Sequence, residues 1–276
     1  MCDPPTPTAG GDGSGACEAV RGLALLAFVL LTFLLSVPFL LLGAWWPHRL
    51  LPGLPIAALM AVCPALAALT LVRLEQGQAG PRRLLRRALD AHRIGRRRTW
   101  ALVLLLGPAI TVTSYAALRA SGAAIPPPQA SPGQVLALAA VFLSGALAEE
   151  LGWTGYATAP LRARLGPLGA GLVLGAVWAL FHLVALRQAH RDASWIAWWS
   201  LYTIAARLIL VWLYDRTGSS VLAASLFHAT LNLGWQLFPV QGSHFDIRVT
   251  ACVTAALAGL LLPAAGSARR QRRDQA

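Results

Sequence analysis

The chain has no lysine, and only 11 of its 276 residues are acidic. Charged residues of both signs make up 12% of the sequence, whereas hydrophobic residues make up 57%. A soluble domain usually carries about 25% charged residues. The shortage of charge therefore excludes an ordinary soluble domain and favours a protein whose helices are buried in lipid.

Cysteine is also scarce, with four residues that form no CxxC pair: Cys2, Cys17, Cys63 and Cys252. This pattern excludes a disulfide framework and a cysteine zinc site. The HExxH motif of zinc-binding helices is absent as well. The net charge of +12 comes from 23 arginines that lie mostly between apolar runs. We therefore expect anionic lipid headgroups as their partner, and no nucleic acid.

The apolar runs predict an all-α polytopic membrane protein with about eight transmembrane helices. The first 22 residues are rich in glycine and proline and predict a disordered tail. The first apolar run is too long for a cleavable signal, so we expect a permanent span. Residues 23–120 form the N-terminal helices, 133–240 a catalytic core in spans four to seven, and 241–276 the last helix and a basic tail. The expected spans are Leu23–Ala44, Leu54–Leu74, Trp100–Ala120, Gly133–Ala157, Gly169–Leu186, Trp195–Tyr214, Ser220–Phe238 and Val249–Pro263.

The arginines predict the orientation of these spans. With the N-terminus inside, 17 arginines fall in cytoplasmic segments and five on the opposite side, namely Arg49, Arg119, Arg187, Arg191 and Arg248. Cytoplasmic loops of membrane proteins carry the excess of basic residues. We therefore expect a multi-pass protein of the cell membrane with both termini in the cytoplasm. The basic stretch 82–98, in which leucine and isoleucine alternate with arginine, predicts an interfacial helix that anchors this orientation.

A few polar side chains lie inside the predicted spans, where a charged residue costs about 2.5–3.5 kcal/mol. Two adjacent glutamates, Glu149 and Glu150, are the least expected, because close carboxylates repel each other and burial disfavours both charges. Such a pair contributes little to structure, so it indicates function. A lone buried histidine is more often a packing residue, and we interpret Arg207 as a structural ion-pair partner. The remaining polar positions are His182, His228 and Asn232.

Helical spacing places some of these groups together. His228 and Asn232 are four residues apart and share one helix face, as do Trp178 and His182. Gly171 and Gly175 form a GxxxG pattern that permits close helix approach. Counting 1.5 Å per residue places Glu149, His182 and His228 at roughly similar depths, which predicts one site in the cytoplasmic half of the bilayer.

Three kinds of chemistry fit this set. In hydrolysis, a carboxylate takes a proton from water while histidine and amide groups stabilise an oxyanion. In a metal alternative, Glu149, His182 and His228 ligate a divalent ion such as zinc, which activates water. In a third, buried carboxylates and histidines relay protons in a transporter. No internal repeat of the kind common in transporters is present, which disfavours the third.

The order of these motifs resembles the CPBP intramembrane proteases, the family of CAAX-processing and bacteriocin-processing (Abi) enzymes, in its bacterial branch. The family pattern is EExxxR, then FxxxH, then HxxxN or HxxxD on separate helices. Here it occurs as "EELGWT" from Glu149, "WALFH" ending at His182 and "HATLN" from His228 to Asn232. Thr154 replaces the family arginine, and Trp178 replaces the phenylalanine.

The resemblance implies roles for the five site residues. Glu149 would activate water with help from His182, Glu150 would support it, and His228 with Asn232 would stabilise the oxyanion. We therefore expect an intramembrane endopeptidase that cuts a peptide or membrane-protein segment. The alternatives are a catalytically silent immunity or scaffold protein of the same family, which the threonine favours, and the transporter. The resemblance does not decide whether a metal takes part.

Overall fold

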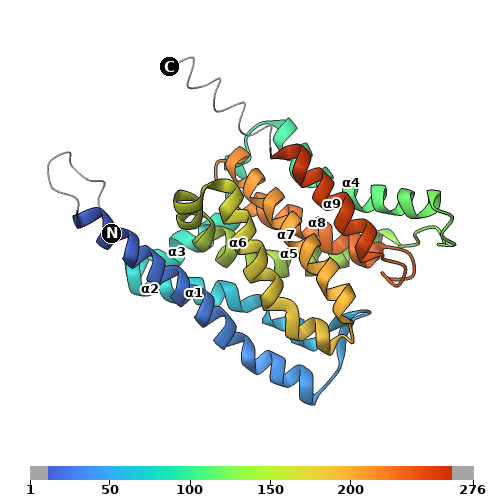
Figure 1. Ribbon diagram of the computed structural model, residues 1–276, viewed down its shortest axis with the longest axis horizontal. Coiled ribbons are helices and arrows are strands. Elements are labelled where there is room, and N and C mark those ends of the chain that lie inside the picture. Colours follow the sequence, from blue (N-terminus) through green and yellow to red (C-terminus); the bar gives the residue numbers. More distant parts are fainter. Residues whose placement is uncertain (1–11, 263–276) are drawn as a thin grey trace.

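The structure is a computed structural model that describes the backbone of residues 12–262 and the side chains from residue 22 onward. The chain forms a helical bundle with one small hairpin (Figure 1). A helix occupies each of the eight predicted spans, so the all-α fold is confirmed. The elements are α1 (Asp12–Trp45), β1 (Arg49–Leu51), β2 (Leu54–Pro55), η1 (Ile56–Val62), α2 (Cys63–Gln76), α3 (Ala79–Arg86), η2 (Arg87–Leu89), η3 (Ala91–Arg93), α4 (Arg97–Ala120), α5 (Pro132–Gly152), η4 (Trp153–Thr158), α6 (Ala159–Gln188), α7 (Ala193–Arg216), α8 (Val221–Leu237) and α9 (Ile247–Leu261).

Several helical segments of the described chain are long and apolar enough to cross a membrane. The longest, 132–188, runs through α5, η4 and α6 and is kinked at Gly166, whose backbone φ is 67°. Helix α9, with 15 residues, is apolar but short. These lengths and compositions support a polytopic membrane protein. The full set of candidate spans is Gly22–Trp45, Ile56–Gln76, Arg97–Ala120, Pro132–Gln188 and Ala193–Arg216.

Four helices begin at side chains that cap them. The side-chain oxygens of Ser131, Asp192, Ser220 and Asp246 accept hydrogen bonds from backbone N–H groups in the first turns of α5, α7, α8 and α9. Each cap satisfies a donor that the helix itself cannot pair, a contribution of about 1 kcal/mol. These caps fix where the polar turns end and the apolar helices begin.

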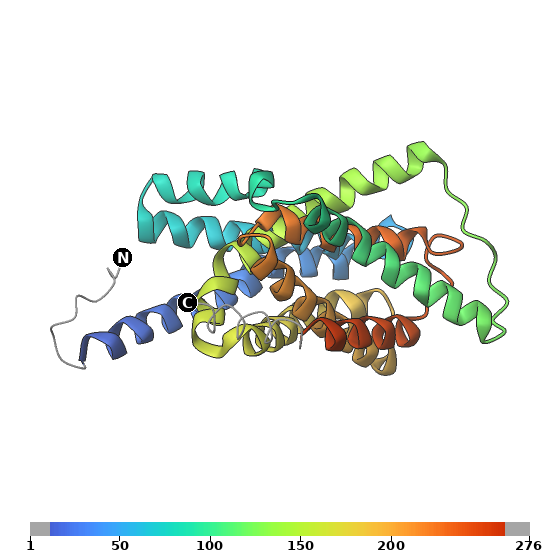
Figure 2. The same cartoon turned by 90° about the horizontal axis from the view of Figure 1, so that it is seen from above.

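The bundle has two ends that differ in charge. The arginine-rich end holds the α2–α3 turn, the segment to α4 and the α7–α8 turn; the arginine-poor end holds the hairpin and the α4–α5, α6–α7 and α8–α9 turns. Figures 1 and 2 show the α2–α3 turn towards the end where α1 begins, and the α4–α5 and α8–α9 turns towards the opposite end. The sequence-based assignment of loops to two sides therefore matches the described fold.

The basic stretch 82–98 is not one helix, contrary to the prediction. It consists of the end of α3, then η2 and η3, and it breaks at Gly95, whose φ is 76°. Asp90 explains the break, because its buried carboxylate accepts hydrogen bonds from the N–H groups of Val221 and Leu222. Arg87 donates to the carbonyls of Gly155 and Ser219. The basic segment is thus bound to the start of α8 by hydrogen bonds.

Three further features were not foreseen. Residues 46–55 contain the β1–β2 hairpin, and a seven-residue 3₁₀ helix, η1, precedes α2. The backbone from Asp12 to 22 is helical where a disordered tail was predicted; residues 1–11 and the basic tail from 263 lie outside the described part. The π-helix η4 directly follows the two glutamates, and π-helical turns are frequent at functional sites.

Glycines bring helices into close contact around the polar centre. A Cβ added at Gly175 of the GxxxG pattern would stand 2.8 Å from Ile204 Cα in α7, and one at Gly171 would stand 2.6 Å from the Leu208 side chain. The predicted close approach at this pattern is confirmed, and α7 is the helix that approaches. Gly152 at the end of α5 meets the backbone of Pro64 in α2 in the same way.

Candidate active site

Glu150 is fully buried, and both of its carboxylate oxygens are paired. Arg207 of α7 donates from Nη1 to Oε2 at 2.8 Å and from Nη2 to Oε1 at 3.1 Å. Thr154 Oγ1 donates to Oε2 at 2.5 Å, and His228 Nδ1 lies 3.1 Å from Oε1. A buried carboxylate is stable only with such partners, so Glu150 is the centre of a structural network.

Thr154 stands where the family pattern has an arginine, and here Thr154 and Arg207 both bond to Glu150. Thr154 lies one turn after Glu150, and its neutral hydroxyl cannot balance the charge of the carboxylate. The guanidinium comes from Arg207 instead, 57 residues away on another helix. The interpretation of Arg207 as a structural ion-pair partner fits this geometry, and its partner is the site residue Glu150.

Glu149 has a different environment from its neighbour. Its Oε2 accepts a hydrogen bond from Trp178 Nε1 at 2.6 Å, and Glu149 lines a pocket between the helices. Trp178 therefore does more than replace one aromatic ring by another, because phenylalanine has no N–H to donate. The same indole lies 4.2 Å below the Arg207 guanidinium, a cation–π contact. Trp178 thus connects the two glutamates through α6.

His182 lies one turn after Trp178 on α6. Its Nδ1 is 2.9 Å from the Trp178 carbonyl oxygen. A carbonyl only accepts, so Nδ1 carries the proton of this bond, and in the neutral ring Nε2 has a free lone pair. The ring also packs against Trp199 of α7, with 5.0 Å between centroids. These contacts fix the ring with the free nitrogen available to the pocket that His182 lines.

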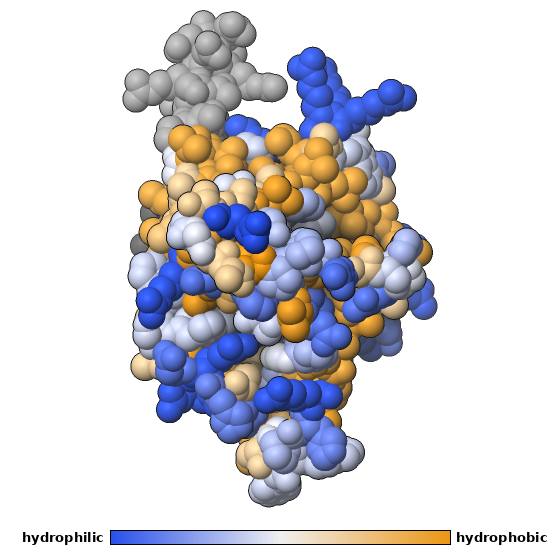
Figure 3. All heavy atoms as spheres, turned by 90° about the vertical axis from the view of Figure 1, so that its right-hand side faces the viewer, coloured by the Kyte–Doolittle hydropathy of each residue, from blue (hydrophilic) through white to orange (hydrophobic). Residues whose placement is uncertain are grey.

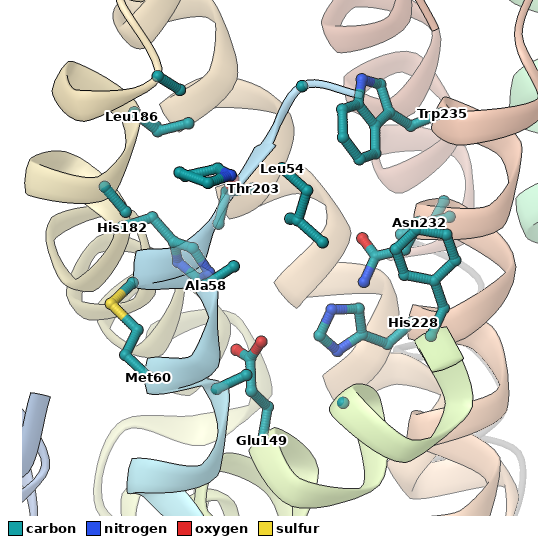
Figure 4. A pocket seen from close by; sticks show the side chains of 18 of the residues that line it. Leu54, Ala58, Met60, Glu149, His182, Leu186, Thr203, His228, Asn232 and Trp235 are labelled. Atoms are coloured by element: carbon teal, nitrogen blue, oxygen red, sulfur yellow. The ribbon is translucent and has the colours of Figure 1, made fainter. Parts of the chain in front are cut away.

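His228 and Asn232 lie one turn apart on α8, as their spacing predicted. Glu150 is paired with arginine and accepts, so His228 donates from Nδ1 and keeps Nε2 available. The imidazole packs edge-on against Trp178, with 4.9 Å between ring centroids. Asn232 lines the same pocket with its amide directed inward (Figure 4).

The pocket joins four of the five predicted residues. It has a volume of about 430 Å³ and is lined mostly by apolar side chains of η1, α5, α6, α7 and α8. Glu149, His182, His228 and Asn232 all face it, and Figure 4 shows them around one space. Glu150 lies behind this wall. An apolar cavity with a few convergent polar groups is the usual form of a small active site.

The metal alternative requires three suitable ligands in one place. Among the described residues, no group of three histidine, cysteine, aspartate or glutamate side chains is arranged to hold a metal ion. The hydrogen bonds of the three proposed ligands do not decide this, because each leaves one atom free: they join Glu149 to Trp178, His182 to a backbone carbonyl and His228 to Glu150. The arrangement described here does not fit a three-ligand site, so we derive no step through a metal.

Comparison with known proteins supports the resemblance to a family of intramembrane proteases. Residues 131–234 match the family described as type II CAAX prenyl endopeptidase Rce1-like. This part of the chain, from the residue that caps α5 to α8, is similar to that family. Over 156 residues it is 26% identical to CAAX prenyl protease 2 of Methanococcus maripaludis, a match that covers 52% of the chain. The chain spans 58% of that relative's length.

The matched segment contains all polar residues of the network, which lie in α5, η4, α6, α7 and α8. The family resemblance inferred from the three motifs is thereby confirmed. The structure places the five residues selected from the sequence close together, four on the pocket and Glu150 behind it, but the sequence analysis did not foresee the contacts of Trp178 and Thr154. The sequence did mark both residues, because each replaces a residue of the family pattern. In the structure, each side chain donates a hydrogen bond to one of the two glutamates.

Proposed function

We propose that this protein is an intramembrane endopeptidase that hydrolyses a peptide bond with water activated by Glu149. One observation carries the proposal: the two adjacent glutamates are bound differently. Glu150 has both oxygens occupied by Arg207, Thr154 and His228. Glu149 has one oxygen held by Trp178 and a side chain that lines the pocket. Only Glu149 is thus free to take a proton from water.

Glu149 acts as general base, and His182 assists it. A base must lie within hydrogen-bond reach of the proton that it takes. A water in the pocket can be shared between the Glu149 carboxylate and the free Nε2 of His182. Trp178 positions both partners, since its indole N–H holds the carboxylate and its carbonyl holds the imidazole.

His228 and Asn232 stabilise the oxyanion. Water attacks the peptide carbonyl carbon, its proton passes to Glu149, and the carbonyl oxygen becomes negative. The amide N–H of Asn232 is one donor for this oxygen. His228 is the second donor when its ring carries a proton on Nε2 as well as the Nδ1 proton directed at Glu150. Such donors lower the barrier by roughly 3–4 kcal/mol. As the C–N bond breaks, Glu149 returns its proton to the leaving amine.

The occupant of the site is a peptide or a segment of a membrane protein. The relative in Methanococcus maripaludis is named for an activity on CAAX prenyl proteins, which supports a protease acting near lipid. We place the protein in the cell membrane with the arginine-rich end in the cytoplasm, because basic residues favour that side. Anionic headgroups are the expected partners of that end.

The test compares the proteomes of membranes from cells that express wild type and Glu149→Ala. Peptide ends that appear only with wild type identify the cleaved substrate. Ser225→Ala, on α8 outside the pocket, is the matched control and should give the wild-type set of ends. Identical sets of ends for wild type and Glu149→Ala, at equal expression, would contradict the proposed activity.

A further inference from the structure

The basic segment 82–98 connects two candidate membrane spans, Ile56–Gln76 and Arg97–Ala120. It contains eight arginines and a single acidic residue, Asp90. A short connection between two spans lies at a membrane surface, because each span ends where the hydrocarbon ends. Figure 2 shows α3 beside α2 and the chain after α3 passing along the start of α8. The segment therefore has an inner face towards the helices and an outer face towards the membrane surface.

The inner face is bound to the start of α8. The buried Asp90 carboxylate accepts hydrogen bonds from Ser220 Oγ at 2.6 Å and from the N–H groups of the first two residues of α8 at 3.2 Å. These N–H groups have no partner inside the helix itself. Two turns further on, the same helix carries His228, whose Nδ1 lies 3.1 Å from Glu150. Asp90 therefore fixes the start of the helix that brings His228 to the site.

The inner face is also bound to η4. Arg87 Nη1 donates to the Gly155 carbonyl oxygen at 2.6 Å, and its Nη2 donates to a carbonyl oxygen in the α7–α8 turn at 2.8 Å. A Cβ added at Gly155 would stand 2.9 Å from the Leu84 side chain, so the segment packs tightly on η4. Gly155 directly follows Thr154, whose hydroxyl donates to Glu150. Arg87 thus connects η4 to the turn before α8, and both elements contribute a partner of the Glu150 carboxylate.

The outer face combines positive charge with two exposed leucines. Leu85 is 48% exposed and Leu89 is 80% exposed, whereas Leu84 and Ile94 are buried. Exposed leucines among arginines are typical of a segment that lies in the headgroup region of an anionic membrane. The exposed arginines are Arg82, Arg83, Arg86, Arg93, Arg96, Arg97 and Arg98.

Repulsion among these arginines opposes the arrangement in which Asp90 and Arg87 hold α8 and η4, which we call the docked state. Asp90 meets Arg93 at 3.9 Å, but its carboxylate is directed to α8. Anionic headgroups reduce the repulsion, and they bind best to the state that holds the arginines together on one outer face. A ligand that binds one of two states more strongly shifts the protein towards that state. An anionic membrane surface therefore favours the docked state.

We propose that the outer face of the basic segment binds anionic phospholipid headgroups and that this binding activates the site through Asp90 and Arg87. In the docked state, α8 and η4 hold His228 and Thr154 on Glu150. Asp90 and Arg87 are positioning residues, since neither lines the pocket. The activation rests on the proposed endopeptidase function, whereas the effect of the lipid on α8 does not.

The first test measures hydrogen exchange without any substrate. Purified protein is reconstituted in phosphatidylcholine alone or in an equal mixture with phosphatidylglycerol, and exchange is followed by mass spectrometry. The anionic mixture should slow exchange in the first turn of α8 about fivefold or more. The first turn of α9, which Asp246 caps, is the internal control and should exchange equally in both vesicles. Equal exchange of α8 in the two vesicles, or equal slowing in α9, would overturn the proposal.

A soluble phosphate ester tests whether a membrane surface is needed. Glycerol phosphate added to phosphatidylcholine vesicles should leave exchange of α8 unchanged, because a free ion does not present an array of charges to the whole outer face. Slowing by glycerol phosphate alone would indicate a site for a single anion and would overturn the assignment to headgroups of the bilayer.

Charge variants test the outer face. Arg82→Gln/Arg86→Gln should abolish the slowing by phosphatidylglycerol. Arg49→Gln/Arg248→Gln removes the same charge from exposed positions at the arginine-poor end and should keep the slowing. Figure 3 views the side on which the α4–α5 and α8–α9 turns lie, and hydrophilic and hydrophobic residues both reach that surface. Slowing that survives the first double variant, or is lost in the second, would overturn the role of the outer arginines.

Turnover in the same vesicles tests the positioning residues. With the substrate identified from membrane proteomes, wild-type kcat should be about fivefold or more higher in the anionic mixture. Asp90→Asn weakens the bonds to α8 and leaves the outer face intact, so the two rates should become nearly equal. Arg87→Gln should have the same effect by releasing η4, and it provides the test if Asp90→Asn does not fold. Arg162→Gln, which breaks a partly exposed ion pair, should keep the ratio. A wild-type ratio in the folded variants would overturn the coupling.

The two proposals fail separately. If phosphatidylglycerol slows exchange in α8 but wild type cleaves no peptide, the lipid effect on α8 stands and the endopeptidase activity does not. If cleavage depends on Glu149 but neither exchange nor turnover differs between the two vesicles, the activity stands and the lipid regulation does not.

Discussion

Arg207 and Glu150 form a bidentate ion pair in which both side chains have no exposed surface. The pair joins α7 to the end of α5, and Thr154 and His228 occupy the remaining positions on the carboxylate. This closed network explains how two adjacent glutamates exist in a hydrophobic bundle. One is neutralised by arginine, and the other is left to face the pocket.

Removing Arg207 should destabilise the protein strongly. Arg207→Gln leaves the Glu150 carboxylate buried without its charge partner, and we expect a loss of about 3–5 kcal/mol in the free energy of unfolding. Thermal and denaturant unfolding in detergent measures it. The matched control is Arg162→Gln, which breaks the partly exposed pair with Asp215 and should cost about 1 kcal/mol or less. Equal losses for the two variants would contradict the structural role of the buried pair.

Trp178→Phe installs the residue of the family pattern and removes one hydrogen bond. The aromatic ring still packs on Arg207 and His228, so folding should be retained. Glu149 loses its indole N–H, and we expect turnover to fall about tenfold as the carboxylate loses its position. Trp199→Phe, whose ring touches His182, should lower turnover less. A Trp178→Phe enzyme with wild-type kcat would show that the bond to Glu149 has no positioning role.

His228 and Asn232 should act as one unit on the oxyanion. Each alanine variant should lower kcat about 10²-fold with little change in KM, since donors to a developing charge act in the transition state. The double variant should lose less than the product of the two single losses. Steady-state kinetics on the substrate identified in membranes measures this. Fully multiplicative losses, or losses mainly in KM, would argue for separate roles.

Metal analysis decides between this role and ligation. With the geometry described, detergent-purified wild type should contain no stoichiometric divalent metal, and chelators should leave turnover unchanged. Metal binding requires deprotonated ligands and is lost when one is removed. One metal ion per chain in wild type that disappears in His228→Ala would replace the oxyanion role by a ligand role.

The sequence predicted the helices well because lipid imposes a simple rule. Backbone groups in a bilayer must be paired within a helix, so apolar runs such as Ala193–Arg216 specify both element and length. The prediction of one helix over 82–98 was wrong for the opposite reason. Its amphipathic pattern indicates a helix, but Asp90 bonds to the start of α8, a contact with a partner 131 residues away that no local pattern contains.

The residues of the candidate site were selected from the sequence, but the contacts between them were not predicted. Spacing alone placed His228 and Asn232 on one face, and motif order selected both glutamates. What separates the roles of Glu149 and Glu150 is the hydrogen bond from Trp178 and the ion pair with Arg207, which come from α6 and α7. Such contacts depend on how helices pack, which no local sequence pattern contains.

Turnover of purified Glu149→Gln, reconstituted in lipid with the identified substrate, tests the central claim most directly. Glutamine keeps the shape and the contact with Trp178 but cannot take a proton. We predict a fall in kcat of about 10²-fold or more with an unchanged unfolding temperature, whereas Glu150→Gln should lower the unfolding temperature by weakening the pair with Arg207. A folded Glu149→Gln enzyme that cleaves at the wild-type rate would contradict the assignment of Glu149 as the base.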